Sequence, residues 1–127
     1  MNIYLLDAGG LFYIAIFAGI LFLLVAVLVE ALIMKLMKYN LFGKAFLHSL
    51  LVNIISAVAG YLLMDTAFDS ETLVGLAGLF LITLIIEGIG LYLLNNKYPV
   101  GKTFKVTLVM NLVTYSFLVF IYIWQNT

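Results

Sequence analysis

The sequence predicts an all-α integral membrane protein, a four-helix bundle built from two tandem two-helix hairpins. The chain of 127 residues is 66% hydrophobic and only 9% charged, whereas soluble domains are about half apolar and a quarter charged. Four apolar stretches reach the length of about 20 residues that a helix needs to cross a bilayer. A similar motif follows the first and the third stretch, which indicates a duplicated unit. Little sequence remains for a soluble domain, so we expect residues 1–127 to form a single membrane domain.

The four predicted spans cover residues 11–34, 45–64, 72–94 and 104–124. Each is apolar enough to lie in lipid, and only short polar segments separate them. The N-terminal segment has Asp7 and no lysine before the first apolar run, so we do not expect a cleavable signal peptide. The spans therefore belong to the mature chain in this interpretation.

Charge placement predicts how the bundle is oriented. All six basic residues lie in two connections, as Lys35, Lys38, Lys44, Lys97, Lys102 and Lys105. The connection between the second and third spans carries Asp65, Asp69 and Glu71 and no basic residue. Because an excess of lysine marks the cytoplasmic side, we expect cytoplasmic lysine loops and both termini outside. Ser70 or Thr72 is expected to cap the third helix.

Aromatic residues near the span ends fit the interfacial belt of membrane proteins. Tyr39 and Tyr98 are expected at the inner interface, and Tyr61, Tyr122 and Trp124 at the outer one. Their simplest role is that of lipid anchors.

The internal repeat comprises units of about residues 11–64 and 72–124. Segments 43–56 and 101–114 align without gaps. The matched pairs are Gly43 with Gly101, Lys44 with Lys102, Ser49 with Thr107, Asn53 with Asn111, and Ser56 with Thr114. These residue types are scarce in the chain, so the matches are not explained by general apolarity. Since each unit holds two spans, we expect a parallel repeat with a pseudo-twofold axis along the membrane normal.

Two acidic residues, Glu30 and Glu87, lie inside the first and third spans. An ionisable residue within a membrane span is expensive and indicates a functional site. Asn53 and Asn111 should lie at a similar depth on the following helices, because they start from the same side of the membrane. We therefore expect each glutamate to pair with the asparagine of its own unit.

A polar seam is predicted on the second and fourth helices. Ser49, Asn53 and Ser56 recur at helical spacing, as do Thr107, Asn111 and Thr114, so each set lies on one helix face. One interpretation is ordinary packing between membrane helices through polar contacts. The other is a site lined by the seam, in which the glutamates exchange a proton or contribute to an oxygen-rich cation site.

Further residues bear on the choice between a packing role and a proton- or cation-binding site. If a glutamate stays ionised, Lys44 and Lys102 are the nearest basic candidates to balance it. Gly88 and Gly90 beside Glu87 permit close approach of a neighbouring helix or of water. His48 has no counterpart in the second unit, so we interpret it as an interfacial residue rather than a ligand.

The composition narrows the range of function classes open to the chain. A net charge of zero and no arginine argue against nucleic-acid binding, and the absence of cysteine excludes disulfides and thiol metal sites. No catalytic constellation is recognisable, so we expect neither an enzyme nor a cofactor, while the metal question stays open. The leading function is transport or ion and proton coupling through Glu30, Glu87, Asn53 and Asn111. The alternative is a non-catalytic subunit or assembly protein of a larger membrane complex.

Four helices provide only a thin core, so we expect the protein to have partners in the membrane. We expect contact with the lipid bilayer and either a homo-oligomer or a larger membrane-protein partner. Small residues four apart, Ala15 with Gly19 and Ser56 with Gly60, could bring helices together inside the bundle or between chains.

Overall fold

A computed structural model describes residues 3–64 and 73–127 of the chain and places four helices in them. These are α1 (Ile3–Leu36), α2 (Phe42–Met64), α3 (Leu73–Leu94) and α4 (Val100–Gln125). All four are long and apolar enough to cross a membrane. The prediction of an all-α protein with four candidate spans is therefore confirmed for the described residues, and the helices fit an integral membrane location. The acidic connection with Asp65, Asp69 and Glu71, and the expected caps Ser70 and Thr72, lie outside these residues.

Three of the four helices, α1, α2 and α4, begin earlier than the apolar stretches predicted for them. α4 starts at Val100 because Pro99, with φ −65°, is pre-shaped for a helix start and has no N–H to leave unpaired. The Pro99 carbonyl accepts the backbone amides of Lys102 at 3.0 Å and Thr103 at 3.2 Å. The first turn of α4 is thus polar, which is why hydropathy alone placed its start too late.

The end of α1 is set by a turn at Lys38, which adopts the left-handed conformation with φ 53°. The Lys38 amide donates to the Lys35 carbonyl at 3.0 Å, and the Tyr39 amide donates to the Met34 carbonyl at 2.8 Å. This is the Schellman arrangement, in which left-handed backbone satisfies the last carbonyls of a helix. It turns the chain so that Tyr39 enters the core beside Met34.

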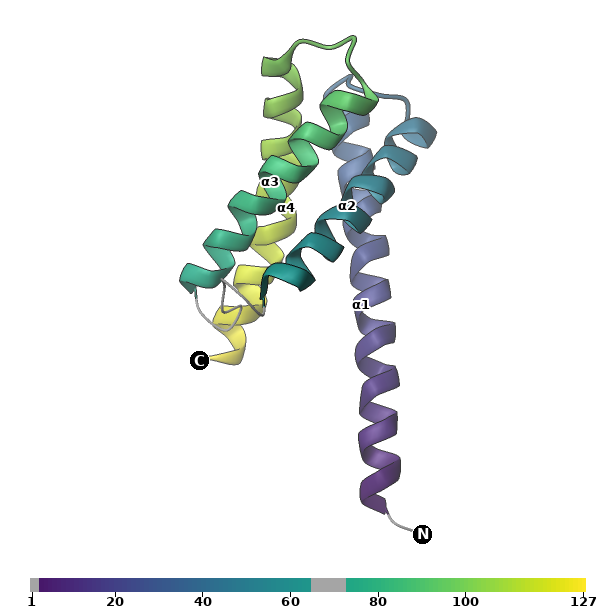
Figure 1. The fold of residues 1–127 in the computed structure, drawn as a ribbon, viewed down its shortest axis with the longest axis vertical. Coiled ribbons are helices and arrows are strands. Elements are labelled where there is room, and N and C mark those ends of the chain that lie inside the picture. The colour runs from purple at the N-terminus through teal and green to yellow at the C-terminus, as the bar shows by residue number, and fades with distance from the viewer. Residues whose placement is uncertain (1–2, 65–72) are drawn as a thin grey trace.

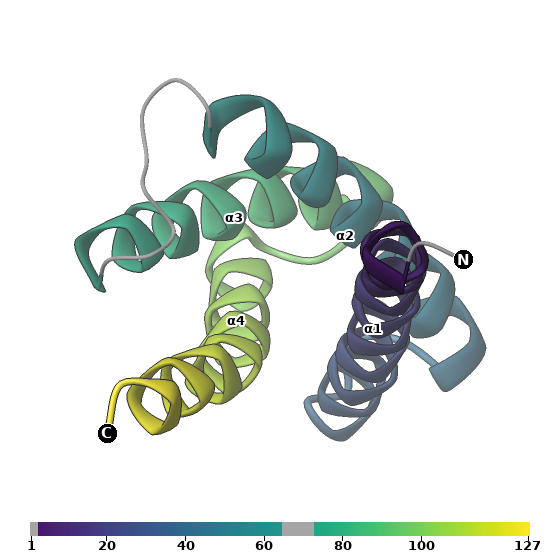
Figure 2. The ribbon, with the colours of Figure 1, turned by 90° about the horizontal axis from the view of Figure 1, so that it is seen from below.

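The helices contact one another as a ring. α1 packs on α2, α2 on α3, α3 on α4, and α4 on α1, whereas the backbones of the diagonal pairs do not come into contact in the described part. The connections 37–41 and 95–99 lie at one end, here named the loop end (top of Figure 1). The opposite end, where α1 begins and α4 finishes, is named the terminal end (seen in Figure 2).

The apolar core fills only the loop-end half of the bundle. Its buried residues are Ala31, Met34, Tyr39, Ala45, Val52, Leu91, Val106 and Met110. By contrast, every residue from position 9 to 22 of α1 is exposed, and this part of α1 extends away from the other helices in Figure 1. The bundle is therefore closed toward its loop end and open toward its terminal end.

Close helix packing depends on Gly90 of α3. A Cβ atom at Gly90 would lie 2.7 Å from Cγ1 of Val52, so α3 approaches α2 there as only glycine allows. The same Cβ at Gly19 or Gly60 would meet nothing within 4 Å. Within the described part of the bundle no neighbour therefore packs closely at Gly19 or Gly60, so packing of Ala15 and Gly19 against another chain stays a prediction, while the expected approach at Gly90 is confirmed.

Candidate functional site

Glu30 of α1 lies in the bundle interior and is 1% exposed. Its carboxylate accepts hydrogen bonds from the Ser49 hydroxyl at 2.6 Å and from the Asn53 amide, both on α2. It also accepts the Thr114 hydroxyl of α4 at 3.1 Å. Glu30 therefore holds α1 to both of its neighbours, and its expected pairing with Asn53 is present.

Glu87 of α3 is equally buried, at 1% exposed. Its Oε2 accepts the Asn111 amide of α4 at 2.9 Å, and its Oε1 accepts the Ser56 hydroxyl of α2 at 3.0 Å. Asn111 also donates to the Thr107 carbonyl at 3.0 Å, which fixes its side chain against its own helix. The expected pairing of Glu87 with Asn111 is thus present as well.

Together these bonds connect the four helices in a circuit that closes through α2 and α4 themselves, and the bonded residues are here named the carboxylate ring. It consists of Glu30, Ser49, Asn53, Ser56, Glu87, Asn111 and Thr114. Each of the four helix pairs in contact is joined by at least one of its bonds. The Ser56 hydroxyl also lies 3.2 Å from the Asn53 carbonyl oxygen, which is an alternative acceptor for the same proton.

One member of the predicted seam lies outside the carboxylate ring. Thr107 is fully buried, but its hydroxyl donates to the Thr103 carbonyl of its own helix at 2.8 Å. Ser49, at the matching place on α2, donates to Glu30 instead. Hydroxyls can always bond to the backbone one turn earlier, so spacing alone does not tell which partner they take.

The two carboxylates of the carboxylate ring are bonded to uncharged groups. Its hydrogen-bond donors are amides and hydroxyls, which stabilise a carboxylate but carry no charge. Lys44 is exposed, and the Lys102 ammonium donates to the Lys38 carbonyl at 2.9 Å instead. Burying an ionised carboxylate without a cation costs several kcal/mol. The site can therefore gain free energy by taking up a proton or a cation.

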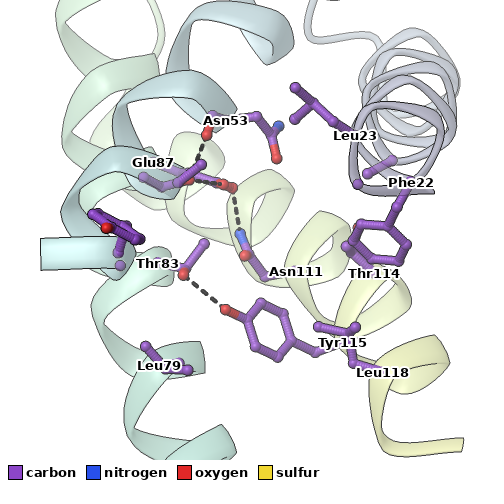
Figure 3. A pocket seen from close by; sticks show the side chains of 16 residues that line it. Phe22, Leu23, Asn53, Leu79, Thr83, Glu87, Asn111, Thr114, Tyr115 and Leu118 are labelled. Carbon is purple, nitrogen blue, oxygen red and sulfur yellow. Dashed lines mark hydrogen bonds between the residues drawn. The ribbon is translucent and has the colours of Figure 1, made fainter. Parts of the chain in front are cut away.

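A cavity of about 400 Å³ adjoins the carboxylate ring on its terminal-end side. Five members of the carboxylate ring line it, Asn53, Ser56, Glu87, Asn111 and Thr114, whereas Glu30 does not. Figure 3 shows Glu87 and Asn111 facing each other across their hydrogen bond at this cavity. The two glutamates thus differ, because one borders open space and the other is enclosed.

A second polar pair lines the same cavity. The hydroxyls of Thr83 and Tyr115 share a hydrogen bond of 2.8 Å, which Figure 3 shows between α3 and α4. The Phe80 ring packs edge-on against Tyr115 with centroids 5.3 Å apart. Sequence reasoning missed this pair, although Thr83 lies four residues before Glu87 and therefore on the same helix face.

The loop end carries its own buried network around Tyr39, which is fully buried. The Tyr39 hydroxyl shares a 3.0 Å hydrogen bond with Thr103 and donates to the Leu91 carbonyl at 3.3 Å. Its ring stacks on Tyr98 at 4.7 Å, and the Lys102 ammonium lies 4.4 Å from the Tyr98 centroid. Burial raises the pKa of the Tyr39 hydroxyl above its ordinary value of 10.0. The expectation that Tyr39 is an interfacial lipid anchor is therefore wrong.

The two loop-end connections are also joined to each other. The Asn95 amide donates to the Asn40 side-chain oxygen at 2.7 Å, and the Asn40 amide lies 3.3 Å from Nδ1 of His48. His48 is 7% exposed, so it is a buried residue of this junction and not one at the interface. Among the described residues, no group of three or more His, Cys, Asp or Glu could hold a metal ion.

Comparisons with models of known protein families, with curated proteins and with solved structures found no match to this chain. The class of protein is therefore defined by the fold alone. Four apolar helices of membrane-crossing length are compatible with a small polytopic membrane protein.

Proposed function

We propose that this chain is a small transport or ion-coupling membrane protein in which Glu30 and Glu87 bind a proton or a cation. The observation that carries the proposal is the carboxylate ring, in which, within the described part of the chain, two buried acids have only neutral hydrogen-bond donors. Neutral amides could join the helices at a lower free-energy cost, because an ionised acid in a membrane interior is strongly unfavourable.

The ring suits reversible uptake of charge. Its asparagines can donate to a carboxylate or accept from a carboxylic acid, and its hydroxyls can do either after a rotation. The same partners therefore satisfy Glu87 whether it is ionised or protonated. Because Glu87 borders the cavity and Glu30 does not, Glu87 is the residue that exchanges a proton or cation first.

We extend the proposal to an internal repeat. In both hairpins an asparagine binds the glutamate of its own unit, Asn53 with Glu30 and Asn111 with Glu87. The hydroxyls of Ser56 and Thr114, matched in the alignment, each cross to the glutamate of the other unit. This reciprocal pattern is what a pseudo-twofold axis along the membrane normal would produce.

The orientation is also a proposal, based on the lysines at the loop end. With the loop end in the cytoplasm and the termini outside, the cavity would open away from the cytoplasm. The buried core around Met34, Tyr39 and Met110 would then separate the carboxylate ring from the cytoplasmic side. In that state the site would be accessible from one side only, as alternating access requires.

Flux measurements in proteoliposomes test the proposal. Uptake of protons, and separately of Na⁺, is driven by an imposed membrane potential for wild type, Glu87→Gln and Glu30→Gln. Loss of one general acid–base or charge partner is expected to lower the coupled flux by about ten-fold or more. Lys105→Gln, an exposed charge change at the loop end, serves as the control. Undiminished flux in both glutamate variants, shown to be folded, would contradict the proposal.

A second candidate is a non-catalytic subunit of a larger membrane complex. It is favoured by the stretch from position 9 to 22 of α1, in which every residue is exposed and which lipid or a partner could cover. Purification in mild detergent, followed by mass determination, separates the two functions. A homo-oligomer free of other proteins supports transport, whereas a larger partner in fixed stoichiometry supports the subunit.

A further inference from the structure

The cavity beside the carboxylate ring has a largely apolar wall and, among the described residues, a single charged side chain. Three aromatic side chains line it, Phe22 of α1, Tyr61 of α2 and Tyr115 of α4. The rest of the wall is partly apolar, for example Leu23 and Leu118 (Figure 3). It also carries the uncharged polar side chains of Asn53, Ser56, Thr83, Asn111 and Thr114. Of the residues that the structure describes, Glu87 is the one acidic side chain of the lining, and no lysine contributes to it. The cavity therefore combines apolar surface, aromatic faces and one carboxylate.

These features discriminate between ligand classes. A hard inorganic cation requires about six to eight oxygen ligands around it and gains nothing from aromatic or aliphatic walls. The volume of about 400 Å³ lies within the range of sites for small organic molecules, which are mostly apolar with a few placed polar groups. Aromatic faces attract cations, and organic ammonium groups in particular.

We propose that this cavity binds an organic monocation with an apolar or aromatic body. The inference rests on the proposed function and names the ligand class for the same site. The cationic head would lie at Glu87 and Asn111, and the body would contact Phe22, Tyr61 and Tyr115. Each oxygen of Glu87 accepts one hydrogen bond from the carboxylate ring, so each keeps a lone pair for the ligand.

A lateral route into the cavity fits the same class. A smaller groove of about 140 Å³ lies between α1 and α4 and is lined by Val25, Val29 and Phe117, among others. It shares Phe22, Ala26 and Thr114 with the cavity. A ligand with an apolar body can partition into the bilayer and enter between these helices, whereas a hydrated inorganic ion cannot.

Direct binding of a probe and its neutral isostere tests the charge requirement. The probes are benzyltrimethylammonium and neopentylbenzene, which have the same shape because a quaternary carbon replaces the nitrogen. Titration calorimetry uses the full chain in lipid nanodiscs, with empty nanodiscs subtracted. We expect the cation to bind about ten-fold or more tightly than its isostere, because only the cation is paired with Glu87. Equal affinities would overturn the proposal.

Variants test the placement. Glu87→Gln is expected to weaken cation binding by about ten-fold or more. Phe22→Leu and Tyr61→Leu are each expected to weaken it by about three-fold, because the benzyl body of the probe loses an aromatic contact. Phe120→Leu is the matched control, since Phe120 is exposed and does not line the cavity. If Glu87→Gln does not fold, unaltered affinity in both aromatic variants still overturns the proposal.

The same preparations separate this inference from the proposed function. Glu87-dependent proton or Na⁺ flux without binding of benzyltrimethylammonium would overturn the ligand class and leave ion coupling intact. Charge-selective binding without any Glu87-dependent flux, including flux of the probe itself, would overturn transport and leave the binding site in place.

Discussion

Gly90 lies where α3 comes closest to α2, and replacing it with alanine tests the packing that positions the carboxylate ring. The added Cβ would lie 2.7 Å from Cγ1 and 3.6 Å from Cβ of Val52. Val52 is 1% exposed and β-branched, so its side chain has one strongly preferred rotamer in a helix and no space to move. The clash must therefore be relieved by displacement of the helices.

The magnitude follows from a comparison with Gly88, two residues earlier on α3. A Cβ at Gly88 would meet Thr107 at 3.8 Å, an ordinary contact. Both alanine variants gain the same helix propensity of about 0.8–1.0 kcal/mol. The difference between them isolates the overpacking at Gly90, which we expect to cost about 1–3 kcal/mol.

The assay is equilibrium unfolding in mixed micelles, followed by energy transfer between labels on α2 and α3. The chain contains no cysteine, so labels can be attached at two introduced cysteines without removing native ones. Val52→Ala removes the clashing methyl group and should restore much of the stability in the double variant, with a coupling of about 0.5–3 kcal/mol. Equal stability of Gly90→Ala and Gly88→Ala would refute the close approach of α2 and α3.

Three further predictions concern single hydroxyl groups. Tyr39→Phe is expected to destabilise the protein by about 1 kcal/mol in the same unfolding assay, because Thr103 and the Leu91 carbonyl lose a buried partner. Burial raises the pKa of the Tyr39 hydroxyl. The stability that this hydroxyl adds to the folded protein is therefore fully present below the ordinary pKa of 10.0, and it is lost as the pH rises through the higher pKa of the folded state. Tyrosinate absorbance should accordingly show one fewer late-titrating tyrosine in Tyr39→Phe, and an unchanged titration would argue against burial. Ser56→Ala should cost about 0.6–2 kcal/mol because its hydroxyl donates to Glu87, whereas Ser116→Ala, whose exposed hydroxyl bonds only to its own helix, should be neutral.

The pairing of each glutamate with an asparagine could be predicted from the sequence, because it depends on the depth of each residue in the membrane and on the helix face that carries it. Depth in the membrane follows from 1.5 Å per residue, and the helix face follows from the 3.6-residue period. Asn53 therefore had to lie near the level of Glu30, and Asn111 near that of Glu87. The bonds that cross between hairpins, from Ser56 and Thr114, depend on how all four helices are rotated, which these rules do not give.

The sequence by itself determined four apolar helices and the burial of two acids among amides and hydroxyls, because lipid tolerates neither exposed backbone nor exposed charge. Tertiary structure alone decided that the polar groups join all four contacting helix pairs, that Glu87 borders a cavity and that Tyr39 is buried. Apolar helices can pack through any of their faces, so hydropathy does not select the contacting one. Steric fit selects the contacting face, for example where Gly90 meets Val52. A single missing Cβ there sets how closely two helices approach.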